Sequence, residues 1–304
     1  MATHPWRLLI SATLALFITA CDKPFETAKN TDSPVSAFQS QINDKFSAFV
    51  KAANSESSIN SRFLPEALYQ YQQETEPQLY AKSTLTSYAV INPAILRTVS
   101  EWLAKGLSLP GELPQLEQAA QSYKASLDAL IPLSETLYAY RQDKGWLKDN
   151  GDLARRSNTA YVSGFTTLLS KRNDFLRAIS AANEELIKSA YENSPSDSAE
   201  HYRNGMVYLS RKTLHELNND RTAAENITLK QDAETLSQLA VGWSKLIQQR
   251  GDNSCHKIID TANDYISSLQ IAIESQAQGK EIAQENIILP FNALVGALSR
   301  HRSC

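Results

Sequence analysis

The sequence predicts an all-α protein, an elongated antiparallel helical bundle built around a long central helical hairpin. Glycine is scarce, with 10 residues among 304, and the chain is rich in good helix formers such as Ala, Leu, Gln, Glu and Lys. Apolar residues recur at steps of three and four, which places them on one face of a helix. The sequence contains no apolar–polar alternation longer than four residues, so no strand is predicted.

The N-terminus carries a signal-like segment that ends at Cys21. Arg7 precedes the apolar run Leu8–Ile18, which is shorter than the roughly 20 residues needed to span a bilayer. This layout is typical of a secretory signal, and Ile-Thr-Ala-Cys at its end is typical of a bacterial lipobox. We predict that residues 1–20 are a lipoprotein signal peptide and that Cys21 is lipidated. The alternative is an ordinary cleaved signal in which Cys21 is incidental.

Residues 21–34 are predicted to form a flexible tether. The segment Asp22–Pro34 is polar and has no periodicity, and as a coil it would span roughly 20 Å. The protein is therefore expected in the bacterial cell envelope, facing the periplasm and held to the membrane by its N-terminal lipid. Asp22 resembles the sorting residue of enterobacterial lipoproteins, which favours the inner over the outer membrane.

Two cysteines remain once Cys21 carries lipid. An even number in a compartment that permits disulfides predicts a bond between Cys255 and Cys304. In the chain-entropy model such a bond contributes on the order of 4 kcal/mol to stability. The alternative is two unpaired thiols.

The first three predicted helices are Val35–Ala53, Leu64–Glu76 and Pro93–Lys105, each with an apolar stripe at helical spacing. The stripe residues are Phe38, Ile42, Phe46, Phe49 and Val50, then Leu64, Leu68 and Tyr71, then Ile95, Val99, Trp102 and Leu103. Gly106 is predicted to cap the third helix at its C-terminus.

Two long helices follow, Glu112–Lys144 with a kink at Pro132, and Asp152–Asn193. The short polar turn Gly145–Gly151 joins them, so they should pack as an antiparallel hairpin. The remaining predicted helices are Ser198–Asn218, Thr228–Gln249, Ser254–Gln278 and Glu281–Arg302, the last bent near Pro290. Residues 35–304 are predicted to form a single helical domain.

The sequence contains no recognisable catalytic or cofactor motif. It has no Gly-x-Ser-x-Gly and no glycine-rich phosphate loop. His201 and His215 would lie about 21 Å apart on one helix, too far to share a metal. The formal net charge of −3 argues against nucleic acid as a partner. We expect no catalytic residue, metal or cofactor; the alternative is an enzyme with an unrecognised helical active site, whose polar cleft would hold groups of shifted pKa.

The hairpin turn is the first choice for an interaction surface. Tyr138, Tyr140, Trp146 and Asp149 gather there, and tyrosine suits amphipathic contact surfaces. The alternative is that Tyr140 belongs to the hairpin core together with Leu137 and Phe165. Lacking a catalytic motif, the chain is best interpreted as a binding or scaffolding protein with an envelope protein as its partner.

The stretch from Tyr123 to Asp149, with Leu-Ile-Pro-Leu, Tyr-Ala-Tyr and Lys-Gly-Trp-Leu-Lys-Asp within it, resembles the YiiG-like lipoproteins. The segment Pro290–Val295 resembles the closing motif of that family. Trp146 stands where a tyrosine is usual, and Ala154-Arg155-Arg156 replaces a Lys/Gly-rich piece. The resemblance implies an all-helical envelope lipoprotein built around a domain of unknown function, and it supplies no mechanism.

Overall fold

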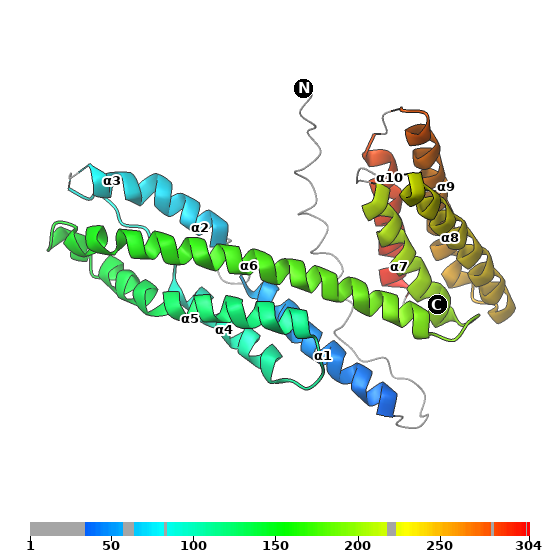
Figure 1. Ribbon diagram of the computed structural model, residues 1–304, viewed down its shortest axis with the longest axis horizontal. Coiled ribbons are helices and arrows are strands. Elements are labelled where there is room, and N and C mark those ends of the chain that lie inside the picture. The colour runs from blue at the N-terminus through cyan, green and yellow to red at the C-terminus, as the bar shows by residue number, and fades with distance from the viewer. Residues whose placement is uncertain (1–33, 57–63, 82–83, 218–222, 281–282, 302) are drawn as a thin grey trace. The chain divides into compact units, whose positions relative to one another are not determined.

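The computed structural model describes residues 34–56, 64–81, 84–217, 223–280, 283–301 and 303–304. Over these residues all regular secondary structure is helical (Figure 1), which confirms the all-α prediction. The predicted signal peptide, Cys21 and the tether up to residue 33 lie outside the described residues. No described helix combines the length and the apolar composition that crossing a bilayer requires.

The chain divides into two compact units, unit 1 ending at Ala182 and unit 2 running from Asn183 to Cys304. This differs from the single helical domain predicted over residues 35–304. The division falls inside helix α6 (Asp152–Asn193). Because a continuous helix crosses the boundary, no glycine-, proline- or serine-rich linker marks it in the sequence.

Unit 1 contains the predicted helical hairpin. Tyr123 of α5 (Pro114–Gln142) lies beside Phe175 of α6, with ring centroids 5.5 Å apart. Nearer the turn, a Cβ placed on Gly164 would lie 3.1 Å from Leu130 Cδ1. The pairing of early α5 with late α6 is the register of an antiparallel hairpin, so that prediction is confirmed.

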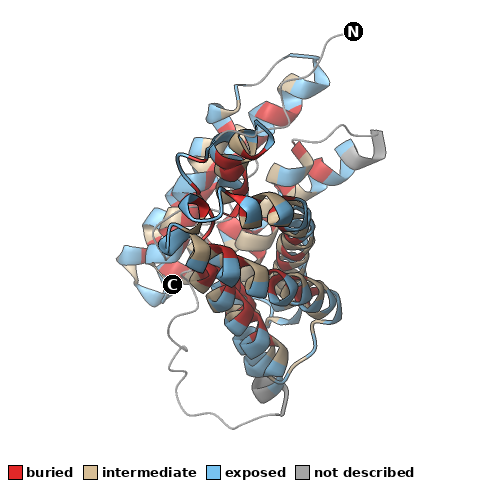
Figure 2. Ribbon diagram, turned by 90° about the vertical axis from the view of Figure 1, so that its left-hand side faces the viewer, coloured by how far each residue is buried: buried red, intermediate tan, exposed pale blue. Residues whose placement is uncertain are grey.

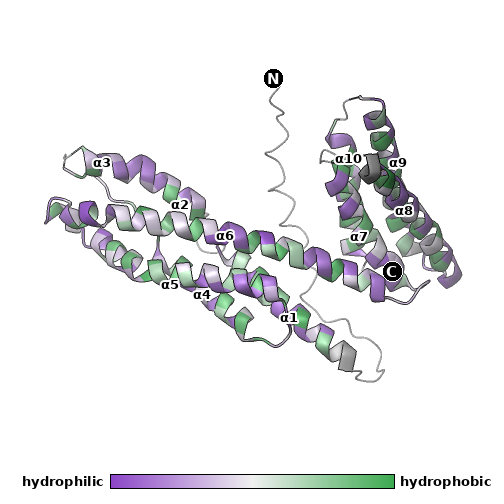
Figure 3. Ribbon diagram, in the orientation of Figure 1, coloured by the Kyte–Doolittle hydropathy of each residue, from purple (hydrophilic) through white to green (hydrophobic). Residues whose placement is uncertain are grey.

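The other described elements of unit 1 precede the hairpin in the chain. They are α1 (Pro34–Ser55), α2 (Leu64–Gln70), the π-helix Tyr71–Thr75, α3 (Glu76–Tyr80) and α4 (Pro93–Ser108). Helix α4 packs against both α1 and α5. Along the helices, buried stretches alternate with exposed ones (Figure 2), and hydrophobic stretches alternate with hydrophilic ones (Figure 3).

The predicted C-cap at Gly106 is wrong, because α4 continues through it to Ser108. Glycine serves a packing role here: a Cβ on Gly106 would lie 2.6 Å from Cε1 of Phe49, a fully buried residue of α1. The missing side chain lets α1 and α4 approach closely. Pro132, where a kink is predicted, lies inside α5.

A partly buried segment without regular structure, residues 84–92, runs between α3 and α4, and the sequence patterns do not indicate it. It buries Leu85 and Tyr88 almost completely. Side chains of neighbouring elements accept from its backbone: Thr75 Oγ1 from the N–H of Ala89 (3.1 Å) and the Tyr161 hydroxyl from that of Ile91 (3.3 Å). These bonds meet the demand that buried backbone polar groups be paired.

A buried ion pair fixes the end of α1 against α6. Arg172 Nε lies 2.9 and 2.8 Å from the two carboxylate oxygens of Glu56, and the Tyr123 hydroxyl donates to the same carboxylate at 3.1 Å. The side chain of Glu56 is 2% exposed and that of Arg172 is 14% exposed. Burial raises the pKa of Glu56, and the charge and hydrogen bonds of Arg172 only partly offset this.

Unit 2 is a sequence of antiparallel neighbours, α7 (Ala199–Leu217), α8 (Ala223–Arg250), α9 (His256–Ala277) and α10 (Glu285–Arg300). Each packs against the next, and α7 also contacts α9. Tyr265 of α9 is fully buried, and its hydroxyl donates to the carbonyl of Ser210 at 2.8 Å. Trp243 of α8 is also fully buried and donates to the carbonyl of Cys304 at 3.2 Å, which holds the C-terminus on the core.

Candidate functional site

The turn between α5 and α6 adopts one tightly specified conformation. It contains a short 3₁₀-helix, Gly145–Leu147, preceded by Lys144 in the left-handed region at φ 49°. Glycine is required at position 145, because a Cβ there would lie 2.2 Å from the ring of Tyr140. The close approach of the Tyr140 ring to the Gly145 backbone therefore fixes the path of the turn.

Asp149 holds the two ends of this turn together. Its carboxylate accepts from the Tyr140 hydroxyl at 2.6 Å and from the backbone N–H groups of Gly151 and Leu153 at 2.9 and 3.0 Å. The bond from Leu153 caps the first turn of α6, and the bond from Gly151 closes the local turn just before that helix. Desolvation alone would raise the pKa of Asp149, but these hydrogen bonds outweigh it and lower the pKa. The pKa of Tyr140 is raised by burial and by the same carboxylate.

Trp146 points inward and is 9% exposed. Its ring lies 6.1 Å from that of Tyr88 and 6.5 Å from that of Tyr140, and the two tyrosine rings are 5.5 Å apart in an edge-to-face arrangement. Among the described residues the indole N–H has no hydrogen-bond partner. The three aromatic side chains thus anchor the turn to the partly buried segment 84–92.

The four residues predicted as an interaction surface are therefore not equivalent. Tyr140, Trp146 and Asp149 come together as the internal frame of the turn. Tyr138, two positions from Tyr140, lies on the opposite side of α5, where the Arg141 guanidinium lies 5.9 Å from its ring centroid.

The outer face of the turn carries side chains that the sequence reasoning missed. Leu147 is 61% exposed, and Lys144 and Lys148 on either side of it are exposed too. Neither lysine has an ion-pair partner in the part of the chain that the structure describes. The available signal was the pair Trp146-Leu147, since a turn this short can bury only one of two adjacent large apolar residues.

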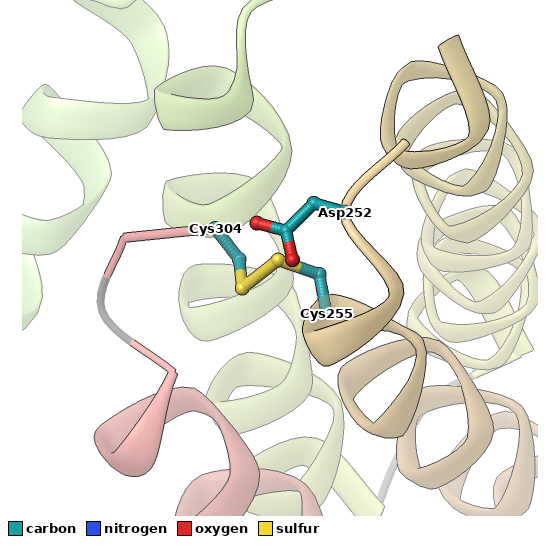
Figure 4. A group of neighbouring side chains, drawn as sticks. All are labelled: Asp252, Cys255 and Cys304. Atoms are coloured by element: carbon teal, nitrogen blue, oxygen red, sulfur yellow. A yellow bond between two sulfur atoms is a disulfide. The ribbon is translucent and has the colours of Figure 1, made fainter. Parts of the chain in front are cut away.

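The disulfide predicted between Cys255 and Cys304 is present in unit 2, and both cysteines are buried. Asp252 lies beside it (Figure 4), and these three residues form the one described cluster of side chains of the types that bind metal. Both sulfur atoms are consumed by the disulfide, so neither offers the thiolate that a metal would bind. Asp252 instead accepts from the N–H and the hydroxyl of Ser254, at 3.1 and 2.6 Å. In this oxidised form the three residues have a structural role, since the disulfide links the C-terminus to the start of α9.

Comparison with protein families gives a match over residues 40–290 to a family described as a protein of unknown function, DUF3829. Comparisons with curated proteins and with solved structures gave no match. The family match covers α1 from residue 40, the other helices of unit 1, the turn between α5 and α6, and most of unit 2. With more than four fifths of its length matched, the chain belongs to the DUF3829 family.

Proposed function

We propose that this protein is a lipid-anchored envelope protein that faces the periplasm and binds a protein partner through the turn between α5 and α6. Within its family it would be a YiiG-like lipoprotein, as the segments Tyr123–Asp149 and Pro290–Val295 suggest. The inner membrane is favoured because Asp22 follows Cys21.

Two features support the envelope location. The apolar run that ends in Ile-Thr-Ala-Cys is typical of lipoprotein export and acylation. The Cys255–Cys304 disulfide fits an oxidising compartment, because disulfides are rare in the cytosol. Stable anchoring would come from more than one acyl chain on Cys21.

The anchor is tested by the intact mass of the protein purified from bacterial membranes. The expected mass is that of residues 21–304 plus several acyl chains. Cys21→Ala should leave the unprocessed precursor or release the protein from the membrane. A mass equal to residues 21–304 without acyl groups would contradict lipidation.

One observation carries the binding proposal: Leu147 is exposed between Lys144 and Lys148, which pair with no described acid, on a turn that is otherwise rigidly held. A pre-organised loop loses little conformational entropy when it binds. Exposed loops on a rigid scaffold are also where binding residues are most often found. The hydrogen bond between Tyr140 and Asp149 and the ring contact between Tyr140 and Trp146 supply that rigidity.

The chemistry of the turn favours an acidic partner surface with an apolar pocket. Leu147 would fill the pocket, while Lys144 and Lys148 would meet carboxylates around its rim. Asp149 keeps its negative charge, since its hydrogen bonds lower its pKa, but these bonds direct the carboxylate toward Tyr140 and the start of α6.

A photo-crosslinking amino acid at position 147 tests this proposal in living cells. A discrete adduct with one envelope protein is expected, and Lys148→Glu should reduce its yield severalfold because it reverses one of the charges. In isolated membranes the yield should also fall as ionic strength rises. The same crosslinker at Ile227 of α8, which is 60% exposed, is the matched control, and Lys230→Glu on that helix is the control for charge reversal.

An adduct that forms equally at positions 147 and 227 would overturn the proposal. So would the absence of any discrete adduct at position 147. An adduct only with lipid, recognised by its small mass increase, would assign the turn to the membrane surface and exclude a protein partner there.

A further inference from the structure

A pocket of about 550 Å³ opens in unit 2. The end of α6, the loop that follows it, the first turn of α7 and the middle of α8 form its walls, and the residues that matter are Tyr191, Asp197, His201, Tyr202, Gln238 and Lys245. This volume lies within the usual range for ligand sites and suits a peptide of a few residues. No residue of the predicted interaction surface and neither cysteine of the disulfide lines this pocket.

Two glycines shape the aromatic walls of this pocket. A Cβ on Gly242 of α8 would lie 2.6 Å from the ring of Tyr202, and one on Gly205 of α7 would lie 2.6 Å from the ring of Tyr191. Each tyrosine therefore lies directly against helix backbone. Tyr191 also stacks on His201, with ring centroids 4.8 Å apart. These contacts fix the walls, so the pocket is formed before any ligand arrives.

Asp197 contributes a negative charge held in a fixed position. Its backbone is in the left-handed region at φ 62°, which is uncommon for a non-glycine residue. Its carboxylate accepts from the Tyr202 hydroxyl at 2.9 Å. Burial, and then this carboxylate, raise the pKa of Tyr202, so the phenol stays neutral and remains a donor. Asp197 has no ion-pair partner among the described residues.

Lys245 contributes the opposite charge from α8. It is exposed and lines the same pocket, yet it pairs neither with Asp197 nor with any other described acid. His201 and Gln238 add hydrogen-bonding groups nearby. A pocket that presents one carboxylate and one ammonium, unpaired with each other, is complementary to a ligand that carries both charges.

We propose that this pocket binds a zwitterionic ligand of short-peptide size, with the ligand's ammonium group at Asp197 and its carboxylate at Lys245. Such a ligand satisfies both charges at once, whereas a ligand of single charge satisfies one and is repelled by the other. The apolar side chains of Leu239 and Val241, which also line the pocket, would contact the ligand between its two ends. The inference does not depend on the lipid anchor or on the turn between α5 and α6.

Calorimetric titration of the full-length protein with trialanine tests the proposal. N-acetyl-trialanine lacks the ammonium and trialanine amide lacks the carboxylate. Each should bind at least about tenfold more weakly than free trialanine, because each lacks one of the two charged groups that the pocket would contact.

Two variants identify which residue recognises which end. Asp197→Asn tolerates the left-handed backbone and can still accept from Tyr202, so the fold should persist; it should bind trialanine and N-acetyl-trialanine equally. Lys245→Gln should bind trialanine and trialanine amide equally. Each variant should keep its discrimination at the other end, because one charge is removed at a time.

Lys230→Gln on α8 and Asp264→Asn on α9 are matched controls, since both residues are exposed and lie outside the pocket lining. They should leave all three affinities unchanged. Equal affinity of wild-type protein for the three peptides, or no binding of trialanine, would overturn the proposal. So would unchanged discrimination in Asp197→Asn and Lys245→Gln.

Discussion

Replacing Arg172 by methionine is expected to lower the free energy of unfolding of unit 1 by about 3 kcal/mol. The substitution keeps most of the apolar stem and removes the guanidinium that holds both oxygens of Glu56 at 2.8–2.9 Å. It leaves a carboxylate with 2% side-chain exposure and without a counter-charge. Urea unfolding followed by circular dichroism measures the change. If the two units unfold at different urea concentrations, two transitions are fitted, one for each unit.

Arg156→Met provides the control for loss of an arginine from the same helix. Its pair with Asp152 is 68% exposed on both sides, so its loss should cost less than about 1 kcal/mol. Adding Glu56→Gln to Arg172→Met should recover part of the stability, because it removes the stranded charge. Equal losses for Arg172→Met and Arg156→Met would show that the buried pair does not hold α1 to α6.

The same site predicts a pH dependence of defined sign. Burial holds the pKa of Glu56 above its ordinary value of 4.5, so the native state binds a proton where the unfolded state has released it. The contribution of this group to stability is therefore greatest below pH 4.5 and falls as the pH rises through the native pKa. Without the guanidinium of Arg172, which lowers that pKa, the fall should extend to higher pH.

The cost of Arg172→Met should accordingly be largest at neutral pH and shrink toward pH 4.5. Urea midpoints measured from pH 4.5 to 8 in wild type, Arg172→Met and Glu56→Gln separate this effect from other titrations. A penalty for Arg172→Met that does not vary over this range would contradict the assignment to Glu56.

Loss of the Cys255–Cys304 disulfide is expected to destabilise unit 2 by about 4 kcal/mol. The two cysteines are separated by 49 positions, so the bond removes considerable freedom from the unfolded chain. It also holds the C-terminus where Trp243 donates to the Cys304 carbonyl. The double variant Cys255→Ala/Cys304→Ala and reductant treatment of the wild type should give similar shifts in the urea midpoint.

Reductant should not change the midpoint of the double variant further, because Cys21 is then the one remaining cysteine and has no second thiol in the chain to pair with. Thiol titration under denaturing conditions verifies the redox state of each sample. An unchanged midpoint for unit 2 after complete reduction would show that packing of α10, and not the disulfide, secures the C-terminus.

Local pattern was sufficient for the helices and for the hairpin. Leu137 and Phe165 lie in apolar stripes at helical spacing, and both are fully buried. The short turn between two long amphipathic helices left little choice other than antiparallel packing. These inferences succeed because helical periodicity is a property of neighbouring residues, whatever the rest of the chain does.

Features that depend on residues distant in the sequence leave no local pattern. The local sequence predicts a cap at Gly106, whereas the ring of Phe49, which requires a glycine there, is distant in the sequence. Glu56 was not singled out, because its partner Arg172 lies 116 positions along the chain. Nothing local distinguishes a buried carboxylate from one on a solvated helix face.

The turn between α5 and α6 shows the same limit at the candidate site. Tyr140, Trp146, Leu147 and Asp149 are close together in the sequence, and they are also close together in the structure. Which of them face inward was decided by the buried segment around Tyr88, which covers Trp146 and leaves Leu147 exposed.

The sequence by itself determined the helical class, the hairpin and the cysteines available for pairing, because helix periodicity and residue counts are local properties. The division into two units inside α6, the burial of Glu56 and the pocket at Asp197 and Lys245 were decided only by the tertiary structure. Each of these depends on which side chains of distant segments meet, and that is set by packing over the whole fold.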